Sequence, residues 1–129
     1  MPAHQSELTV IVKAKDLASY VITVTDKSPK RFRFTLVSKL QGYALNALEN
    51  LYRANEVYVA KDDADAAARR LNHQHQALVE LKLLAYMAQL AMEQGCILQK
   101  QYEQVTRKAY DCRNLLGAWM NSDRKRLGA

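Results

Sequence analysis

The sequence contains few of the residues that form tight turns. Its 129 residues include four glycines and two prolines, and Pro29 is the only proline away from the N-terminus. A fold of many short strands needs frequent turns, which glycine and proline mostly supply. We therefore expect no all-β fold. Hydrophobic residues make up 49% of the chain, which is enough for one core of ordinary size, so we expect a single domain over residues 1–129.

Cysteines and long apolar runs are also scarce. The two cysteines, Cys96 and Cys112, do not have the spacing of a metal site, and the N-terminal segment MPAHQSEL has no basic stretch followed by an apolar core. No apolar run approaches the roughly 20 residues that cross a bilayer. We expect a reduced, cytoplasmic setting without a membrane span, and we interpret Cys112 as a small buried side chain.

The common catalytic motifs are missing from the sequence. There is no Gly-x-Gly-x-x-Gly, no phosphate loop, no Gly-x-Ser-x-Gly and no Glu-x-x-His pair of the kind that binds iron in helical bundles. His73 and His75 stand two positions apart, so on a helix they point about 200° from each other and do not bind one ion from one face. We therefore expect no metal, no cofactor and no enzymatic activity.

Apolar side chains recur every three to four positions in the first half of the chain, which predicts helices over residues 7–26 and 29–60. Ser28 and Pro29 have the form of an N-cap followed by proline at the first helical position. The alternating stretch Arg31-Phe32-Arg33-Phe34 is typical of a strand or of a nucleic-acid surface, but we interpret it as the first turns of the second helix. The predicted core stripes consist of Val10, Ala14, Leu17, Val21 and Val24, then Phe34, Val37, Gln41, Ala44, Leu48, Leu51, Asn55 and Tyr58.

The second half predicts helices over 64–94 and 98–121. The stretch KDDAD (61–65) reads as a turn and cap, Gly95 as a stop signal, and residues 121–123 as the end of the last helix before a basic tail over 122–129. Four such helices with short connections predict an all-α, up-and-down antiparallel four-helix bundle. From Leu81 to Met92 the third helix is apolar almost all round, which implies a second buried face. We assign Leu84 and Met87 to an interface between copies of the chain.

Positive charge is unevenly distributed along the chain. Nineteen Lys and Arg residues against thirteen Asp and Glu give a net charge of +6, and residues 27–48 contain five bases and no acid. Cations near a helix N-terminus oppose the helix dipole, so something other than helix stability accounts for them. Acid-base spacing on the helices gives Arg53, Arg69 and Arg107 local partners. A solvated basic face and a phosphate-binding surface both stay open, whereas most tyrosines and Trp119 are interpreted as core side chains rather than as platforms for bases.

The arrangement of these helices resembles one known family. Three stretches carry the resemblance: VIVKAKDLASYVITVTDKSPK, RFRFTLVSKLQGYALNALENLYRANE and GCILQKQYEQVTRKAYDCRNLLGAWMNSD, which with the third helix span nearly the whole chain. They are similar to the bundle proteins that include the accessory variability determinant (Avd) proteins of diversity-generating retroelements and the proteins encoded in ribosomal RNA intervening sequences.

The resemblance implies a homopentameric ring that has no activity of its own and associates with a reverse transcriptase and its template RNA during mutagenic cDNA synthesis. The family has no fixed binding motif, so local basicity selects the candidate contacts with RNA or polymerase: Arg31, Arg33, Lys39, Arg70, Lys82 and Lys108. The alternative is a structural or interaction bundle of the intervening-sequence type, with an unknown partner and weak or no contact with nucleic acid.

Overall fold

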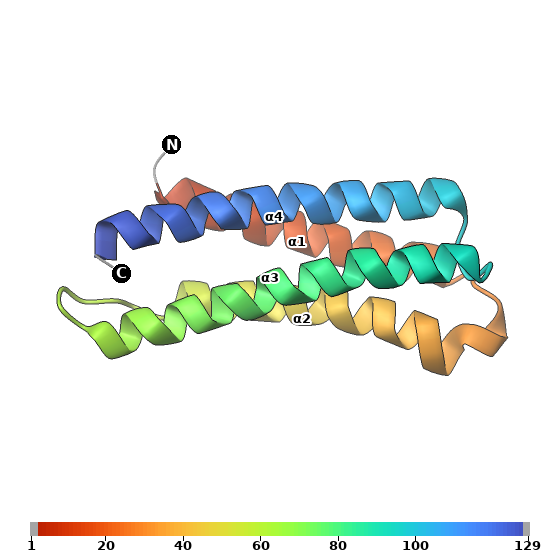
Figure 1. Ribbon diagram of the computed structural model, residues 1–129, viewed down its shortest axis with the longest axis horizontal. Coiled ribbons are helices and arrows are strands. Elements are labelled where there is room, and N and C mark those ends of the chain that lie inside the picture. Colours follow the sequence, from red (N-terminus) through yellow and green to blue (C-terminus); the bar gives the residue numbers. More distant parts are fainter. Residues whose placement is uncertain (1–2, 128–129) are drawn as a thin grey trace.

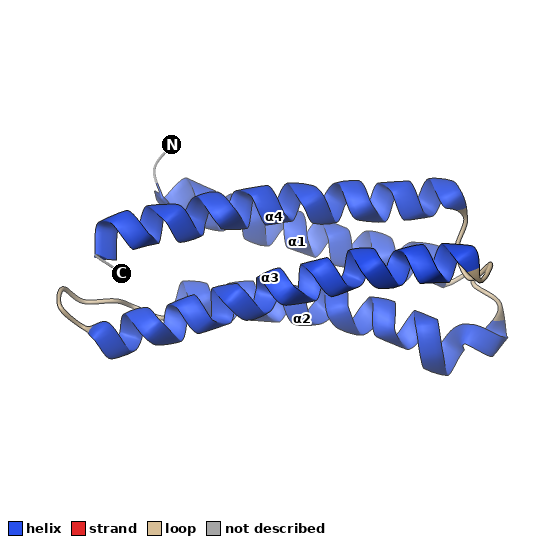
Figure 2. Ribbon diagram, viewed as in Figure 1, coloured by secondary structure: helices blue, strands red, loops and turns tan. Residues whose placement is uncertain are grey.

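The protein is an up-and-down bundle of four antiparallel helices (Figures 1 and 2). The computed structural model describes residues 3–127, which contain no strand. Its helices are α1 (Ala3–Thr25), α2 (Ser38–Glu56), α3 (Ala64–Glu93) and α4 (Gln99–Leu127). Each helix packs against two neighbours, α1 and α3 both contacting α2 and α4. The predicted fold class is thereby confirmed for the single chain, and none of the helices within residues 3–127 is long and apolar enough to cross a membrane.

The core is built from large side chains on some faces and alanines on others. The fully buried large side chains include Leu17 on α1, Leu51 on α2, and Leu116 and Trp119 on α4. Many buried positions of α2 and α3 are alanines: Ala44, Ala47, Ala54, Ala77, Ala88 and Ala91. Small side chains allow two helix backbones to approach closely, which is consistent with α2 and α3 forming the most extensive pairing in the bundle.

The second helix does not begin as a regular α-helix. A 3-10 turn (Lys30–Phe32) and a π turn (Arg33–Val37) precede α2. The predicted helix start at Pro29 is close, but the predicted capping role of Ser28 is wrong. Its hydroxyl donates to the carbonyl oxygen of Cys96, 2.7 Å away in the connection between α3 and α4, and so does not cap its own helix.

The connection between α2 and α3 starts earlier than predicted. α2 ends at Glu56 instead of Ala60, so Tyr58 lies in the loop and is exposed rather than in the core. The predicted turn and cap that follow are confirmed: Asp62 has a positive φ of 66°, and the Asp63 carboxylate accepts a hydrogen bond from the Ala66 amide at 3.0 Å. These two residues reverse the chain and start α3 at Ala64.

The last helix continues beyond its predicted end. α4 runs to Leu127, so most of the predicted basic tail is helical, and residues 128–129 of that tail lie outside the described part. The prediction was wrong because Asp123, taken as a helix-ending polar residue, is buried and hydrogen-bonded to Arg70 at 2.7 and 3.1 Å and to Gln74 at 2.8 Å on α3. Burial of this carboxylate holds the end of α4 against α3.

Candidate nucleic-acid interface

Five cations gather where α1 connects to the second helix, and we call them the basic end: Lys27, Lys30, Arg31, Arg33 and Lys39. All five side chains belong to exposed residues. This end of the bundle also holds the connection between α3 and α4, whereas both termini lie at the opposite end (Figure 1). The fold therefore collects the positive stretch of the sequence at one end of the rod.

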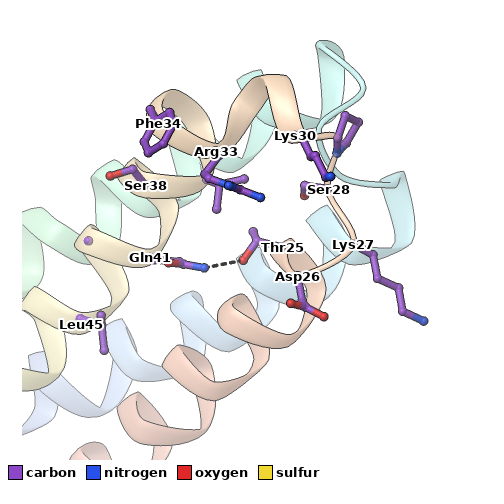
Figure 3. Close-up of a pocket in the computed structure, with 13 residues that line it drawn as sticks. Thr25, Asp26, Lys27, Ser28, Lys30, Arg33, Phe34, Ser38, Gln41 and Leu45 are labelled. Atoms are coloured by element: carbon purple, nitrogen blue, oxygen red, sulfur yellow. Dashed lines mark hydrogen bonds between the residues drawn. The ribbon is translucent and has the colours of Figure 1, made fainter.

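A pocket of about 640 Å³ lies within the basic end, between the last turn of α1 and the first turns of the second helix (Figure 3). Lys27, Lys30 and Arg33 line it, together with one carboxylate, Asp26. Lys30 and Arg33 extend from the second helix toward the end of α1, and Lys27 points away from the bundle (Figure 3). The lining thus contains more positive than negative groups.

A hydrogen-bond chain fixes the inner wall of this pocket. The Gln41 amide donates to the Thr25 hydroxyl at 3.0 Å (Figure 3). That hydroxyl donates in turn to the Val21 carbonyl at 2.7 Å. Thr25 is buried, so a hydroxyl without these partners would destabilise the fold. These hydrogen bonds join α1 to α2 and hold together the two helices that form the walls of the pocket.

The cations of the basic end form no ion pair. Among the side chains of residues 9–127 no carboxylate lies within 4 Å of any of the five, whereas Arg70, Lys108 and Arg126 each form an ion pair. Arg31 instead lies over the Phe32 ring at 4.5 Å, and Lys39 over the Tyr43 ring at 5.9 Å. Solvent-facing charges of one sign attract an anion without first having to break an internal pair.

Lys39 also acts on a carboxyl group of the neighbouring helix. Burial raises the pKa of the Glu80 side chain on α3, and the positive charge of Lys39 partly opposes this effect. One carboxyl oxygen of Glu80 is buried without a hydrogen-bond partner among the described residues. Of the five cations of the basic end, Lys39 is therefore the one whose charge acts on α3.

The six predicted contact residues do not form one surface. Arg31, Arg33 and Lys39 lie together at the basic end, and Lys82 is exposed on α3 outside it. The assignment of Arg70 needs correction, because its guanidinium is buried and bonded to Asp123. Lys108, also predicted as a contact, already has an internal partner: its ammonium group contacts the Asp16 carboxylate of α1 at 2.8 Å and lies over the Tyr20 ring at 5.4 Å.

The structure adds residues to the interface that the sequence analysis did not assign. Lys27 and Lys30 line the pocket, and the ring of Phe34 at its rim is 87% exposed, although the helical pattern placed Phe34 in the core. The π turn that contains Phe34 explains the difference, since its wider winding breaks the spacing on which the pattern depends. The acid-free run from Lys27 to Leu48 was the signal that located the two lysines.

The predicted local ion pairs are not observed. In the described part of the chain, Glu49–Arg53, Asp65–Arg69 and Glu103–Arg107 do not approach within 4 Å. Exposed pairs of this spacing contribute little free energy, so the side chains are free to extend into water. These three arginines are therefore additional surface cations, spread over the sides of the bundle rather than gathered at the basic end.

A second surface feature is an apolar row on α3, which we call the outer face of α3: Val79, Leu83, Tyr86 and Leu90. A second apolar face thus lies on α3, as the pattern predicted, but Leu84, one of the two residues assigned to the interface, does not belong to it. Leu84 is fully buried in the bundle's own core, and Met87 is half-buried against that core. The spacing of four, three and four residues in the outer face is that of a coiled-coil seam.

The groups with possible chemical reactivity are poorly placed for reaction. Burial raises the pKa of the Cys112 thiol to about 12, so the nucleophilic thiolate is scarce at neutral pH. Cys96 is also buried. Among the side chains of residues 9–127, no three His, Cys, Asp or Glu come together in a way that could hold a metal ion.

Comparison with known proteins does not assign the chain to a family. No protein-family model matches the sequence, and a search of curated proteins found no relative with significant similarity. The geometry of the basic end and of the outer face of α3 is therefore the ground on which a function can be proposed.

Proposed function

We propose that this protein is a non-catalytic adaptor that binds nucleic acid through the basic end. The observation that carries the proposal is the set of five exposed cations at one end of the bundle, none of which forms an ion pair with a described carboxylate. Several of them stand in the first turns of a helix, where each exposed cation costs about 0.3–1 kcal/mol of helix stability. Phosphate groups would offset that cost, and a nucleic acid supplies several of them at close spacing.

Within this proposal, the resemblance of the sequence to accessory variability determinant proteins suggests a specific setting. The nucleic acid would be the template RNA of a diversity-generating retroelement, held beside its reverse transcriptase in the cytoplasm while mutagenic cDNA is made. A reverse-transcriptase gene and adjacent near-identical repeats next to the gene for this protein would support the assignment. A reading frame inside a ribosomal RNA gene would contradict it.

The outer face of α3 supports the proposal of a homo-oligomer, with the pentameric ring of the resembling family as the expected form. Leu83 is 39% exposed, Leu90 41% and Tyr86 78%, so a contiguous row of large side chains faces away from the core. In a ring, such a row would pack against the next subunit, and several basic ends would act on one polyanion. Multiple weak contacts of this kind raise the overall affinity without requiring a strong site on each subunit.

A second candidate is a structural or interaction bundle whose partner is another protein. The outer face of α3 favours it, because an apolar helix face accepts a partner helix without any phosphate. The two candidates differ in their dependence on salt. Counterion release makes nucleic-acid binding weaker as salt rises, whereas apolar packing is insensitive to moderate salt.

The test of nucleic-acid binding replaces Arg31, Arg33 and Lys39 by glutamine and measures the anisotropy of a labelled RNA from low to moderate salt. Loss of three phosphate contacts should weaken binding at least tenfold and reduce the slope of log K against log salt by about 2. The matched control replaces Lys13, Lys15 and Lys125, which are exposed outside the basic end, and removes the same charge. Equal losses in the two variants would contradict a localised interface.

The test of assembly places aspartate in the outer face of α3. Leu83→Asp with Leu90→Asp should reduce the mass measured by light scattering while the circular-dichroism spectrum stays helical, because both side chains are partly exposed. Leu84→Asp should unfold the chain instead, since a fully buried position does not accept an unpaired charge. An unmutated protein that elutes as a monomer would remove the ring from the proposal.

A further inference from the structure

We infer that the pocket at the basic end binds an unpaired nucleotide of a single strand, with a base stacked on Phe34 and the adjoining phosphate held by Lys30 and Arg33. This inference rests on the proposed function and specifies its ligand. It joins two features: the exposed ring at the rim of the pocket and the cations within it.

The position of Phe34 is unusual for a ring in an apolar stripe. Val37, three residues later, is buried as the helical pattern predicts, whereas Phe34, in the same π turn, is 87% exposed. Five-residue π turns within helices are uncommon and occur often at functional sites. Here the turn removes a large ring from the core and presents its face to solvent.

The pocket beside the ring has the size and charge for a nucleotide. Its volume of about 640 Å³ falls within the range of small-ligand sites, which is about 300–1,000 Å³. Lys30 and Arg33 point toward its interior, and Arg33 precedes Phe34 in the chain (Figure 3). The fixed planar donors of arginine suit a phosphate oxygen pair, and Lys30 adds a second charge. The lining contains one acidic residue, Asp26, and three cations, Lys27, Lys30 and Arg33.

The ring determines which form of nucleic acid fits. In a duplex, both faces of each interior base are covered by stacked neighbours, so a protein ring has no free face to contact. In a single strand the bases can separate, and one base can stack on an aromatic side chain while the cations hold the backbone. A duplex can still contact the lysines and arginines by its phosphates. The pocket should therefore prefer a single strand over a duplex of the same sequence.

The experiment compares Phe34→Ala with the unmutated protein on a labelled single-stranded RNA and on the matching duplex, by anisotropy at fixed salt. Loss of one base stack should weaken single-strand binding about tenfold and change duplex binding less than twofold. Because Phe34 is almost fully exposed, the variant should keep its helicity and melting temperature. Arg33→Gln should weaken the binding of both RNAs and reduce the slope of log K against log salt by about 0.7–0.9.

Phe34→Trp provides a direct signal of stacking. The native Trp119 is fully buried, so RNA bases do not reach it, and quenching of the new tryptophan by single-stranded RNA would report contact at position 34. The matched control is Tyr58→Trp. Tyr58 is 83% exposed in the connection between α2 and α3, and single-stranded RNA should not quench the fluorescence of a tryptophan at that position.

The outcomes separate this inference from the proposed function. If Phe34→Ala binds both ligands as the unmutated protein does, or if Phe34→Trp is not quenched, the stacking site is overturned while nucleic-acid binding by the basic end still stands. If no RNA binds at any salt, the proposed function fails first. If Phe34→Ala changes the mass of the protein by light scattering, Phe34 belongs to a contact between copies and the inference is overturned.

Discussion

The two ends of the bundle use arginine and lysine in opposite ways. At the basic end five exposed cations have no carboxylate within 4 Å in the described part of the chain. At the opposite end Arg70 is buried and pairs with Asp123, which also pairs with Arg126 at 2.8 Å. Arg70 therefore attaches α3 to α4, whereas the five cations of the basic end, like Arg124 and Lys125 at the opposite end, stay exposed to water. Burial together with an acidic neighbour decides between these two arrangements.

The opposite end illustrates how a buried charge is tolerated. The Arg70 guanidinium gives two hydrogen bonds to the Asp123 carboxylate, a third to the Val57 carbonyl at 3.4 Å, and stacks over the Trp119 ring at 5.0 Å. Gln74, also buried, gives the same carboxylate a further bond. The charged and amide groups of this cluster are therefore hydrogen-bonded, which is the condition under which a buried ion pair persists, whereas the indole N–H of Trp119 is buried without a partner among the described residues.

The largest expected effect comes from breaking that cluster. Asp123→Ala should destabilise the protein by about 3–5 kcal/mol, because it leaves the Arg70 charge buried without its partner. Thermal and urea unfolding followed by circular dichroism measure the change. Asp111→Ala, at an exposed position of the same helix, is the control and should shift stability by less than about 0.5 kcal/mol. Similar losses in the two variants would show that Asp123 has no special role.

A triple substitution sharpens the comparison by removing both charges and the buried amide that bonds to them. Arg70→Met and Gln74→Met with Asp123→Leu should recover most of the stability lost in Asp123→Ala, since well-packed apolar side chains replace the buried polar cluster at little cost and leave no buried amide without a partner. RNA binding by the basic end, measured well below the melting temperature, should be unchanged. A loss of binding in this variant would mean that the two ends are not independent.

The next effect has the opposite sign and concerns the basic end. Replacing Lys30 and Arg31 by glutamine should stabilise the protein by about 0.3–1 kcal/mol for each residue, because cations in the first turns of a helix oppose its dipole. The gain should shrink in high salt, which screens exposed charges. Unfolding curves at two salt concentrations measure both effects. Destabilisation would indicate that these cations support the fold rather than a partner.

The smallest effect is a pH dependence in the middle of the bundle, between the two ends. A hydrogen bond and the positive charge of Lys108 lower the pKa of the exposed Asp16 carboxyl. A carboxyl group with a depressed pKa contributes stability above its unfolded pKa, and this contribution is lost as pH falls through the folded value. Lys108→Met should raise the pKa of Asp16 toward 3.8, as measured by NMR titration. An unchanged titration would show that the pair does not form in solution.

The sequence predicted which residues are helical better than it predicted which way they face. Helical spacing located all four helices, and the stop at Gly95 and the cap at Asp63 were read correctly because these signals are local. Helical spacing did not predict that Leu84 is buried and Leu83 partly exposed. At this point α3 is apolar on both sides, and only packing decides which side meets the bundle's own core.

Charge pairing was predicted poorly for a related reason. The sequence suggests partners three or four positions away, whereas the pairs that form across helices join Arg70 to Asp123 and Lys108 to Asp16, which are 53 and 92 positions apart. Such partners become neighbours only after the helices align. The exposure of Phe34 was missed because a helical pattern assumes regular winding, and no residue in RFTLV signals a π turn.

The hydrogen bond between the Ser28 hydroxyl and the Cys96 carbonyl has a mechanical consequence for the whole rod. It joins the connection between α1 and α2 to the connection between α3 and α4. The α1–α2 hairpin and the α3–α4 hairpin are therefore linked at the basic end by a hydrogen bond from a side chain to the backbone. A force applied to the basic end therefore acts on the start of α4 as well as on α1 and α2, and both hairpins resist it together.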